Sequence, residues 1–161
     1  MKIPAEVFRA YDIRGVAGPV LSAELVREIG RAIGSVGRER GAPTFAVGRD
    51  GRLSSPELAA ALMDGLNAAG ADVIDIGIVP TPVTYFAAHH LGCGSAVMVT
   101  GSHNPKDDNG LKTVIAGDTL SGEGIQDLRK RVEGGRHHGG AGKRGAANVL
   151  GANVERGAGD G

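Results

Sequence analysis

The sequence has few aromatic residues, a single cysteine and no excess of charge of either sign. Tryptophan is absent, and the 161 residues include only three phenylalanines and two tyrosines. One cysteine excludes an internal disulfide and any zinc site built from several cysteines, and it favours a reducing compartment. Basic and acidic residues both number 18, so the formal charge is zero, which argues against a nucleic-acid-binding protein.

Long apolar runs are also missing. No stretch approaches the roughly 18 apolar residues that a membrane span requires. The N-terminal residues MKIPAEVFRAYD carry charges where a signal peptide needs its apolar segment. We therefore expect a cytoplasmic protein with no membrane partner. At this length, one domain with a substantial core is expected.

Glycine is abundant instead: 28 of the 161 residues, about 17% against a usual share of roughly 7%. It has no three-residue period, which excludes a collagen-like fibre. Residues 134–161 contain 10 of these glycines but only three large aliphatic side chains. Such a segment buries too little apolar surface to offset its ordering entropy. We expect a domain over 1–133 and a disordered Gly/Ala/Arg-rich tail over 134–161, with His137 and His138 in solvent.

The first 133 residues alternate between predicted helices and strands. Apolar spacing predicts helices over 22–38, 55–69, 81–91 and 122–132, and β-rich runs predict strands over 44–47, 73–78, 95–100 and 111–115. Ser22 and Ser55 are the expected N-caps, the second before a proline, and Asn109-Gly110 is the expected tight turn with positive φ. This order predicts a layered α/β/α fold with a mainly parallel mixed sheet.

The most informative segment is the loop TGSHNP at 100–105, directly after an apolar strand. Open α/β sheets bind ligands beyond the carboxyl ends of their strands, so Ser102 is placed for chemistry. Gly101 would allow a ligand close to the backbone, and His103 could orient a phosphate or move a proton. An ordinary polar loop explains the same residues equally well. The loop is not a G-x-S-x-G elbow, and no phosphate-binding glycine motif follows a strand.

Three further segments carry cations that suit phosphate binding. Arg14 stands beside a glycine and could bind a phosphate through two hydrogen bonds, although a solvated loop with an Asp12–Arg14 pair is the simpler interpretation. The segment GRDGR at 48–52 precedes a helix N-terminus, or is a turn held by an Arg–Asp pair. Lys112 could aim its ammonium at the serine loop, or lie on the surface of an edge strand.

Together these segments resemble the α-D-phosphohexomutase family, and within it the bacterial phosphomannomutase/phosphoglucomutases. The resemblance is carried by AYDIRG at 10–15, VGRDGR at 47–52, DVIDIGIVPTP at 72–82, TGSHNP at 100–105 and DNGLK at 108–112. The commoner form of the serine loop has alanine where Gly101 stands.

The resemblance implies that Ser102 is a phosphoserine, which exchanges its phosphoryl group with a hexose phosphate through a bisphosphorylated sugar. His103, Lys112 and Arg14 match catalytic positions around it, and Tyr11, Arg14 and Lys112 match substrate-binding positions. The implied partners are glucose and mannose 1- and 6-phosphates, with a hexose 1,6-bisphosphate as activator. A Mg²⁺ would bind the phosphate on Ser102 together with three aspartates. Arg49 and Arg52 match the base of the cleft, where a structural or electrostatic role is expected.

The resemblance covers only the first of the family's four domains. The aspartate-rich metal loop D-G-D-x-D and domains II–IV are missing from the sequence given. Three alternatives follow: the N-terminal piece of a mutase, a non-catalytic module that binds sugar phosphates or a partner, or an inactive gene fragment. The tail suggests a truncated or frame-shifted reading frame. The choice between glucose and mannose is not encoded in these residues.

Overall fold

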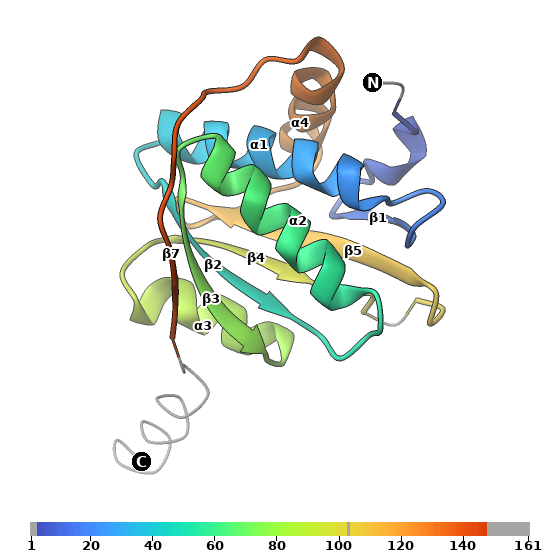
Figure 1. Ribbon diagram of the computed structural model, residues 1–161, viewed down its shortest axis with the longest axis horizontal. Helices are drawn as coiled ribbons and strands as arrows, with labels where there is room; N and C mark the ends of the chain where they lie inside the picture. Colours follow the sequence, from blue (N-terminus) through green and yellow to red (C-terminus); the bar gives the residue numbers. More distant parts are fainter. Residues whose placement is uncertain (1–2, 103, 148–161) are drawn as a thin grey trace.

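A mixed sheet lies between two layers of helices (Figure 1) in the computed structural model, which describes residues 3–102 and 104–147. In these residues the sheet has seven strands, ordered β1-β5-β4-β2-β3-β7, with β6 beside β5. The strands are β1 (Ile13–Val16), β2 (Thr44–Arg49), β3 (Asp72–Ile78), β4 (Ser95–Val99), β5 (Asp108–Ile115), β6 (Asp118–Thr119) and β7 (Arg144–Ala146). The helices are η1 (Ala5–Val7), α1 (Ala23–Glu39), α2 (Ser55–Ala68), α3 (Thr81–His90) and α4 (Glu123–Gly134).

Two cores of unequal size hold the layers together. On one face, α1, α2 and α4 bury aliphatic side chains against the sheet, around Phe45, Val97 and Leu111. On the other face, α3 packs a smaller cluster against Ala46 and Met98. The predicted α/β/α layering is confirmed, with a sheet that is half parallel and half antiparallel.

The antiparallel half arises from the serine loop. β2 pairs in parallel with β3 and β4, whereas β5 runs antiparallel to both β4 and β1. A parallel return would need a long crossover, but the chain between β4 and β5 is a short loop without a helix. The loop therefore lies at the carboxyl ends of β2, β3 and β4, where ligand sites of open α/β sheets lie.

The sequence predicted the positions of most helices and strands, but one helix cap and one turn were predicted wrongly. The Ser22 hydroxyl caps α1 by accepting a hydrogen bond from Leu25 N at 3.1 Å, as predicted. Ser55 is not the cap of α2: it is the first helical residue, and its hydroxyl bonds to Asp50 instead. The turn expected at Asn109-Gly110 is also wrong, because both residues lie within β5 and neither has positive φ.

The segment after α4 also differs from expectation. Residues 135–147, here called the C-terminal strap, cross α1 and end in β7, which pairs in parallel with β3 (Figure 1). Backbone hydrogen bonds hold it at the open sheet edge, among them Val73 N to Lys143 O at 2.8 Å and Lys143 N to Asp72 Oδ1 at 2.8 Å. Low apolar content predicts disorder only for a segment that has no pairing partner. Here the unpaired edge of the sheet supplies one. Residues 148–161 lie outside the described residues.

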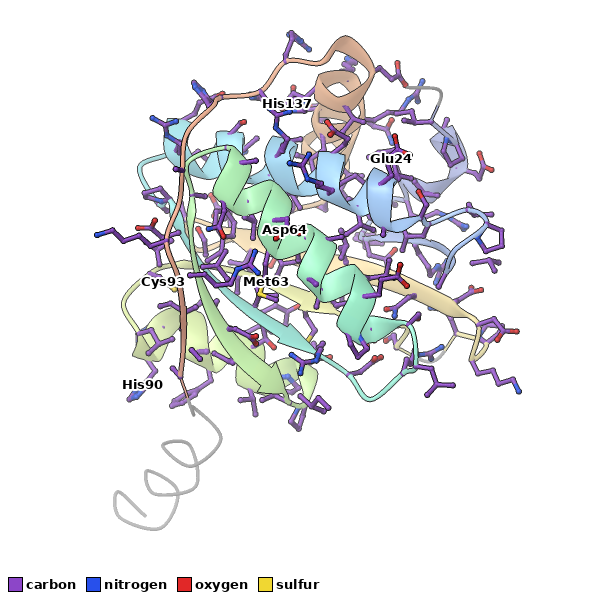
Figure 2. All side chains as sticks on the ribbon, in the orientation of Figure 1. Glu24, Met63, Asp64, His90, Cys93 and His137 are labelled. Atoms are coloured by element: carbon purple, nitrogen blue, oxygen red, sulfur yellow. The ribbon has the colours of Figure 1, made fainter. Side chains whose placement is uncertain are left out.

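His137 is another correction. Its side chain is 4% exposed, and its Nε2 lies 3.4 Å from Glu28 on α1; Figure 2 shows it where the strap passes α1. His138 is 45% exposed and its ring bonds to Glu39 at 3.0 Å. No helix in the described residues has both the length and the apolar character to cross a bilayer.

Candidate active site

The loop after β4 presents Ser102 to solvent. Ser102 is exposed and has φ of +54°, a left-handed conformation that costs a residue with a Cβ conformational energy. Its N–H donates to Thr100 Oγ1 at 3.0 Å. Asn104 closes the loop, since its backbone N–H and its Nδ2 both donate to Gly101 O, at 3.0 and 2.8 Å. The surrounding structure must therefore hold Ser102 in place.

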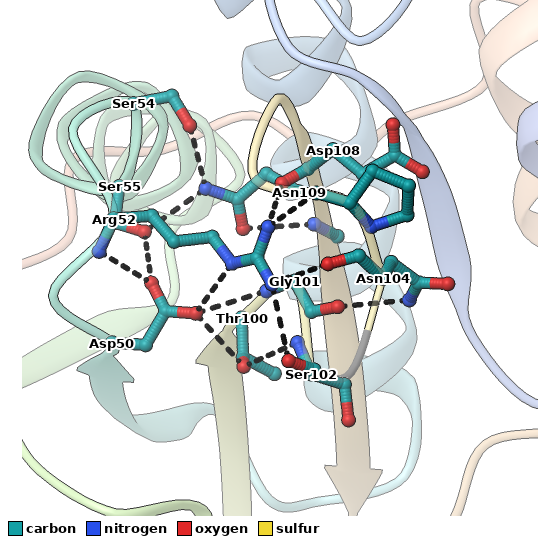
Figure 3. Close-up of polar contacts among 12 residues, drawn as sticks. Asp50, Arg52, Ser54, Ser55, Thr100, Gly101, Ser102, Asn104, Asp108 and Asn109 are labelled. Carbon is teal, nitrogen blue, oxygen red and sulfur yellow. Dashed lines mark hydrogen bonds and ion pairs between the residues drawn. The ribbon is translucent and has the colours of Figure 1, made fainter.

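Asp50, just after β2, anchors the start of this loop (Figure 3). Its carboxylate accepts from Thr100 Oγ1 and Gly101 N, both at 3.0 Å, from Arg52 N at 3.1 Å, and from the Ser55 hydroxyl. Burial by itself raises the pKa of the Asp50 carboxyl, but these hydrogen bonds together hold it below its usual value. Asp50 is therefore ionised at neutral pH and links β2, α2 and the serine loop.

Arg52 anchors the rest of the loop (Figure 3). Its Nη1 donates to Pro105 O at 2.6 Å and Asp108 O at 3.0 Å, and its Nη2 donates to Ser102 O at 3.1 Å and Asn104 O at 2.9 Å. Its Nε lies 3.3 Å from Asp50 Oδ2. One guanidinium thus gathers four backbone carbonyls between β4 and β5.

Asn109 completes the frame from the far side of the loop. Its Nδ2 donates to the hydroxyls of Ser54 and Ser55, both at 2.9 Å. It is fully buried, which explains why β5 begins before the predicted strand and includes it. The N-terminus of α2 is thereby tied to β5.

Arg14 and Lys112 lie on the same face of the sheet. Arg14 on β1 is opposite Gly110 on β5, and Lys112 is two residues further along β5, so the two residues are diagonal neighbours, a relation that places Cα atoms roughly 7–8 Å apart. Arg14 Nη1 donates to Asn104 Oδ1 at 2.8 Å, in place of the Asp12 pair weighed from the sequence. Lys112 is half-buried, and its side chain has no hydrogen bond or ion pair with another described residue.

The remaining candidates are more distant or cannot be placed. Tyr11 precedes β1, is 81% exposed, and borders a recess with Leu120 and Ile125. The Arg49 side chain reaches Asp75 on β3 at 3.4 Å, and it has no hydrogen bond or ion pair with those residues of the serine loop that the structure describes. His103 lies outside the described residues. The structure thus joins Ser102 to Arg14 through Asn104, and it assigns Arg52 to the loop itself.

A magnesium site does not fit the residues present. Over 3–102 and 104–147, no three histidine, cysteine, aspartate or glutamate side chains gather into a group that could hold a metal. Asp50 is the half-buried carboxylate of the loop frame, and its oxygens are engaged by protein donors. Any Mg²⁺ at Ser102 would need ligands from outside the described residues.

Sequence reasoning missed Asp50, Ser55, Thr100 and Asn109 as the frame of the loop. Only the Arg–Asp pair of 48–52 was foreseen, as the alternative to a phosphate contact. One feature of the sequence could have indicated this frame: short polar side chains are numerous beside the ends of three predicted strands. Partners across 50 residues cannot be paired from spacing alone.

Comparison with known proteins agrees with this geometry. The family model described as phosphoglucomutase/phosphomannomutase, alpha/beta/alpha domain I, matches residues 5–138. A phosphomannomutase/phosphoglucomutase of Pseudomonas aeruginosa is 60% identical over 131 residues, which are 81% of this chain and 28% of that protein. A phosphoglucomutase of Neisseria gonorrhoeae is 50% identical over 131 residues, again 81% of this chain and 28% of the relative.

A solved structure of a phosphoglucomutase/phosphomannomutase family protein from Burkholderia thailandensis superposes with a TM-score of 0.92 at 49% identity. It covers 96% of this chain, and the match spans 36% of that protein. The chain therefore spans less than a third of the length of the curated relatives it matches.

Proposed function

The chain belongs to the phosphoglucomutase/phosphomannomutase family, and we propose that it is the phosphoserine-bearing N-terminal part of a phosphohexomutase. Its role is to carry the phosphoryl group that moves between the C1 and C6 oxygens of a hexose. The observation that carries this proposal is Ser102: an exposed serine in a left-handed conformation at the carboxyl end of β4, held by Asp50 and Arg52.

The chemistry proposed for Ser102 is phosphoryl exchange. The Oγ–P bond forms as the bond between phosphorus and the sugar oxygen breaks, and the serine proton ends on that oxygen. The reverse step returns the phosphoryl group to the other end of the sugar. Such transfer depends on positioning and on stabilising charge at the phosphoryl oxygens.

Arg14 and Lys112 are the cations proposed to supply that charge. They share a sheet face, and Lys112 has no partner elsewhere in the described chain. Lys112 is thus free to donate to a phosphoryl oxygen or to a sugar hydroxyl. Tyr11 and His103 remain candidates by their match to the family motifs.

The rest of a mutase site would come from elsewhere. Mg²⁺ supplies charge neutralisation at a transferring phosphoryl group, but the described residues do not form a site for it. We propose that glucose or mannose phosphates, a hexose 1,6-bisphosphate and the metal are bound jointly with domains II–IV of a longer protein.

Uptake of phosphate tests the proposal on the chain itself. The chain is incubated with glucose 1,6-bisphosphate, with and without Mg²⁺, and its intact mass and modified residue are determined. We expect the gain of one phosphoryl group at Ser102 and no gain in Ser102→Ala. Ser121→Ala, which changes an exposed serine away from the loop, should be modified like the unchanged chain. Equal labelling of Ser102→Ala would refute the assignment.

One alternative is a module that binds sugar phosphate without transferring it, and the exposed Ser102 beside the cations Arg14 and Lys112 is compatible with it. Saturable binding of glucose 1-phosphate with no phosphate on Ser102 would support it. Mutase turnover that disappears in Ser102→Ala would exclude it.

A further inference from the structure

We propose that Arg52 is a positioning residue for Ser102, and that its guanidinium shapes the serine loop without contacting the phosphate. The expected effect of Arg52 on phosphoryl transfer rests on the proposed function. The positioning role itself stands on the hydrogen bonds of the loop alone.

Arg52 has no free Nη donor. A guanidinium carries five N–H groups in a fixed plane. The four on Nη1 and Nη2 are donated to four backbone carbonyls, and the fifth, on Nε, faces Asp50 at 3.3 Å. A phosphate could be bound by Arg52 only if loop carbonyls lost their partners.

The guanidinium of Arg52 is also enclosed. The Arg52 side chain is 16% exposed and that of Asp50 22%. Above it lies Gly101, where a Cβ would overlap the Cζ and Nε of Arg52. The absence of a side chain at Gly101 therefore lets the loop close over the guanidinium, which opposes any swing of Arg52 towards the solvent.

The backbone of Ser102 is held on both sides of its Cα. Its carbonyl accepts from Arg52 while its N–H donates to Thr100, so both backbone groups that flank its Cα are held. These bonds oppose relaxation of φ from +54° to the right-handed or extended regions. Arg52 thereby fixes the direction in which the serine hydroxyl leaves the backbone.

Lysine cannot reproduce this arrangement. An ammonium keeps the positive charge but has three donors radiating from one atom, so it cannot reach four carbonyls spread along a loop. Arg52→Lys therefore separates the two possible roles. If charge is what matters, lysine substitutes for arginine; if positioning matters, it does not.

The first measurement is hydrogen exchange of the loop amides in the 161-residue chain. Arg52→Lys should speed exchange at Gly101, Ser102 and Asn104 by about tenfold or more, because two or more charge-assisted hydrogen bonds are lost. Core amides of β4 should keep their rates. Arg129→Lys, on the exposed side of α4 with its partner Glu133, is the matched control and should change none of the loop amides.

The second measurement is the rate of Ser102 phosphorylation by glucose 1,6-bisphosphate. In Arg52→Lys the maximal rate should fall by about tenfold or more while the half-saturating concentration stays within about twofold, because the phosphate-binding cations are unchanged. A higher half-saturating concentration with an unchanged maximal rate would assign Arg52 to phosphate binding and overturn the proposal.

Two outcomes separate the proposal from the function on which it rests. If the unchanged chain takes up no phosphate, the proposed function fails for this chain, and the exchange measurement still decides the role of Arg52. Loop amides that exchange in Arg52→Lys as they do in the unchanged chain would refute positioning. If Arg52→Lys loses its helical circular dichroism, Arg52→Gln carries the same test, because its amide has only two N–H donors and cannot reach the four carbonyls, while the direct bonds of Asp50 to the loop are kept.

Discussion

Gly30 on α1 is one of the residues without a side chain at which helices α1 and α2 approach closely, and replacing it with alanine probes this packing. A Cβ built at Gly30 lies 2.6 Å from Leu62 O and 3.3 Å from both Gly65 Cα and Leu66 N. All three atoms belong to the backbone of α2, so no side-chain rotation can relieve the contact. Gly30→Ala must push the two helices apart.

The size of the effect follows from two opposing terms. Close carbon–oxygen contacts lie at about 3.3–3.6 Å, so the methyl group is too close to Leu62 O by roughly 0.7 Å. Overpacking of this kind costs about 1–3 kcal/mol. Alanine gains up to about 1 kcal/mol over glycine within a helix. We expect a net loss of about 1–2 kcal/mol, because the contact is to rigid backbone and both helices enclose the larger core.

Urea unfolding followed by circular dichroism measures this difference, with thermal melting as a second measure. A loss of 1–2 kcal/mol corresponds to a fall in Tm of roughly 2–8 °C for a domain of this size. Gly134→Ala is the matched control. Gly134 lies at the end of α4, a Cβ there would come no closer than 3.5 Å to the flexible Arg136 side chain, and the change should be neutral or slightly stabilising. A Gly30→Ala chain as stable as Gly134→Ala would refute the close helix crossing.

Two further predictions concern the β1–β5 contact and the strap. Gly110→Ala places its methyl group against Ile13 O on β1, so it should cost about 1–3 kcal/mol in urea unfolding, whereas Gly51→Ala, with open space around it, should cost far less. Equal stability of the two variants would contradict the β1–β5 register. His137 has a lowered pKa because it is buried and lies near Arg31, so the folded chain prefers the neutral ring. The stability that the neutral His137 ring contributes is fully present above pH 6.5, the ordinary pKa of histidine, and is lost as the pH falls below it. His137→Gln should weaken this pH dependence of the free energy of unfolding, measured between pH 7.5 and 5. An unchanged pH dependence would show that His137 is not buried.

Elements with strong local signals were predictable from the sequence, because their determinants lie within one segment. The stripe of α1 and its Ser22 cap are contained in 18 residues. β1 was not predicted: it is four residues long, and it forms through pairing with β5, almost 100 residues away. The strap was missed for a similar reason, since its order comes from the exposed edge of β3 and not from its own composition.

The glycine excess illustrates the same limit. Glycines in the motif loops, among them Gly48, Gly51, Gly101 and Gly110, were expected where a turn needs close backbone approach or positive φ. Gly48, Gly101 and Gly110 lack positive φ, but they lie where another chain segment leaves no room for a Cβ, so close approach is found without the special backbone conformation. Gly51 has neither property. Glycines in the strap pack closely too: a Cβ at Gly140 would lie 2.8 Å from Gly70 Cα. Close approach is a property of two segments, which composition does not report.

The cations of the candidate site show why the motif and the geometry contribute different information. Arg14, Arg52 and Lys112 are all basic residues in segments that resemble one family, and by sequence each could bind a phosphate. In the structure their free donors differ: Arg52 has donated all four Nη hydrogens to loop carbonyls and holds Nε beside Asp50, the Arg14 side chain has given one bond to Asn104, and the Lys112 side chain has given none to the described residues. A donor can stabilise a transferring phosphoryl group only if the protein has not already used it. We therefore expect Arg52 to shape the loop and the side chains of Arg14 and Lys112 to be available for a phosphoryl group.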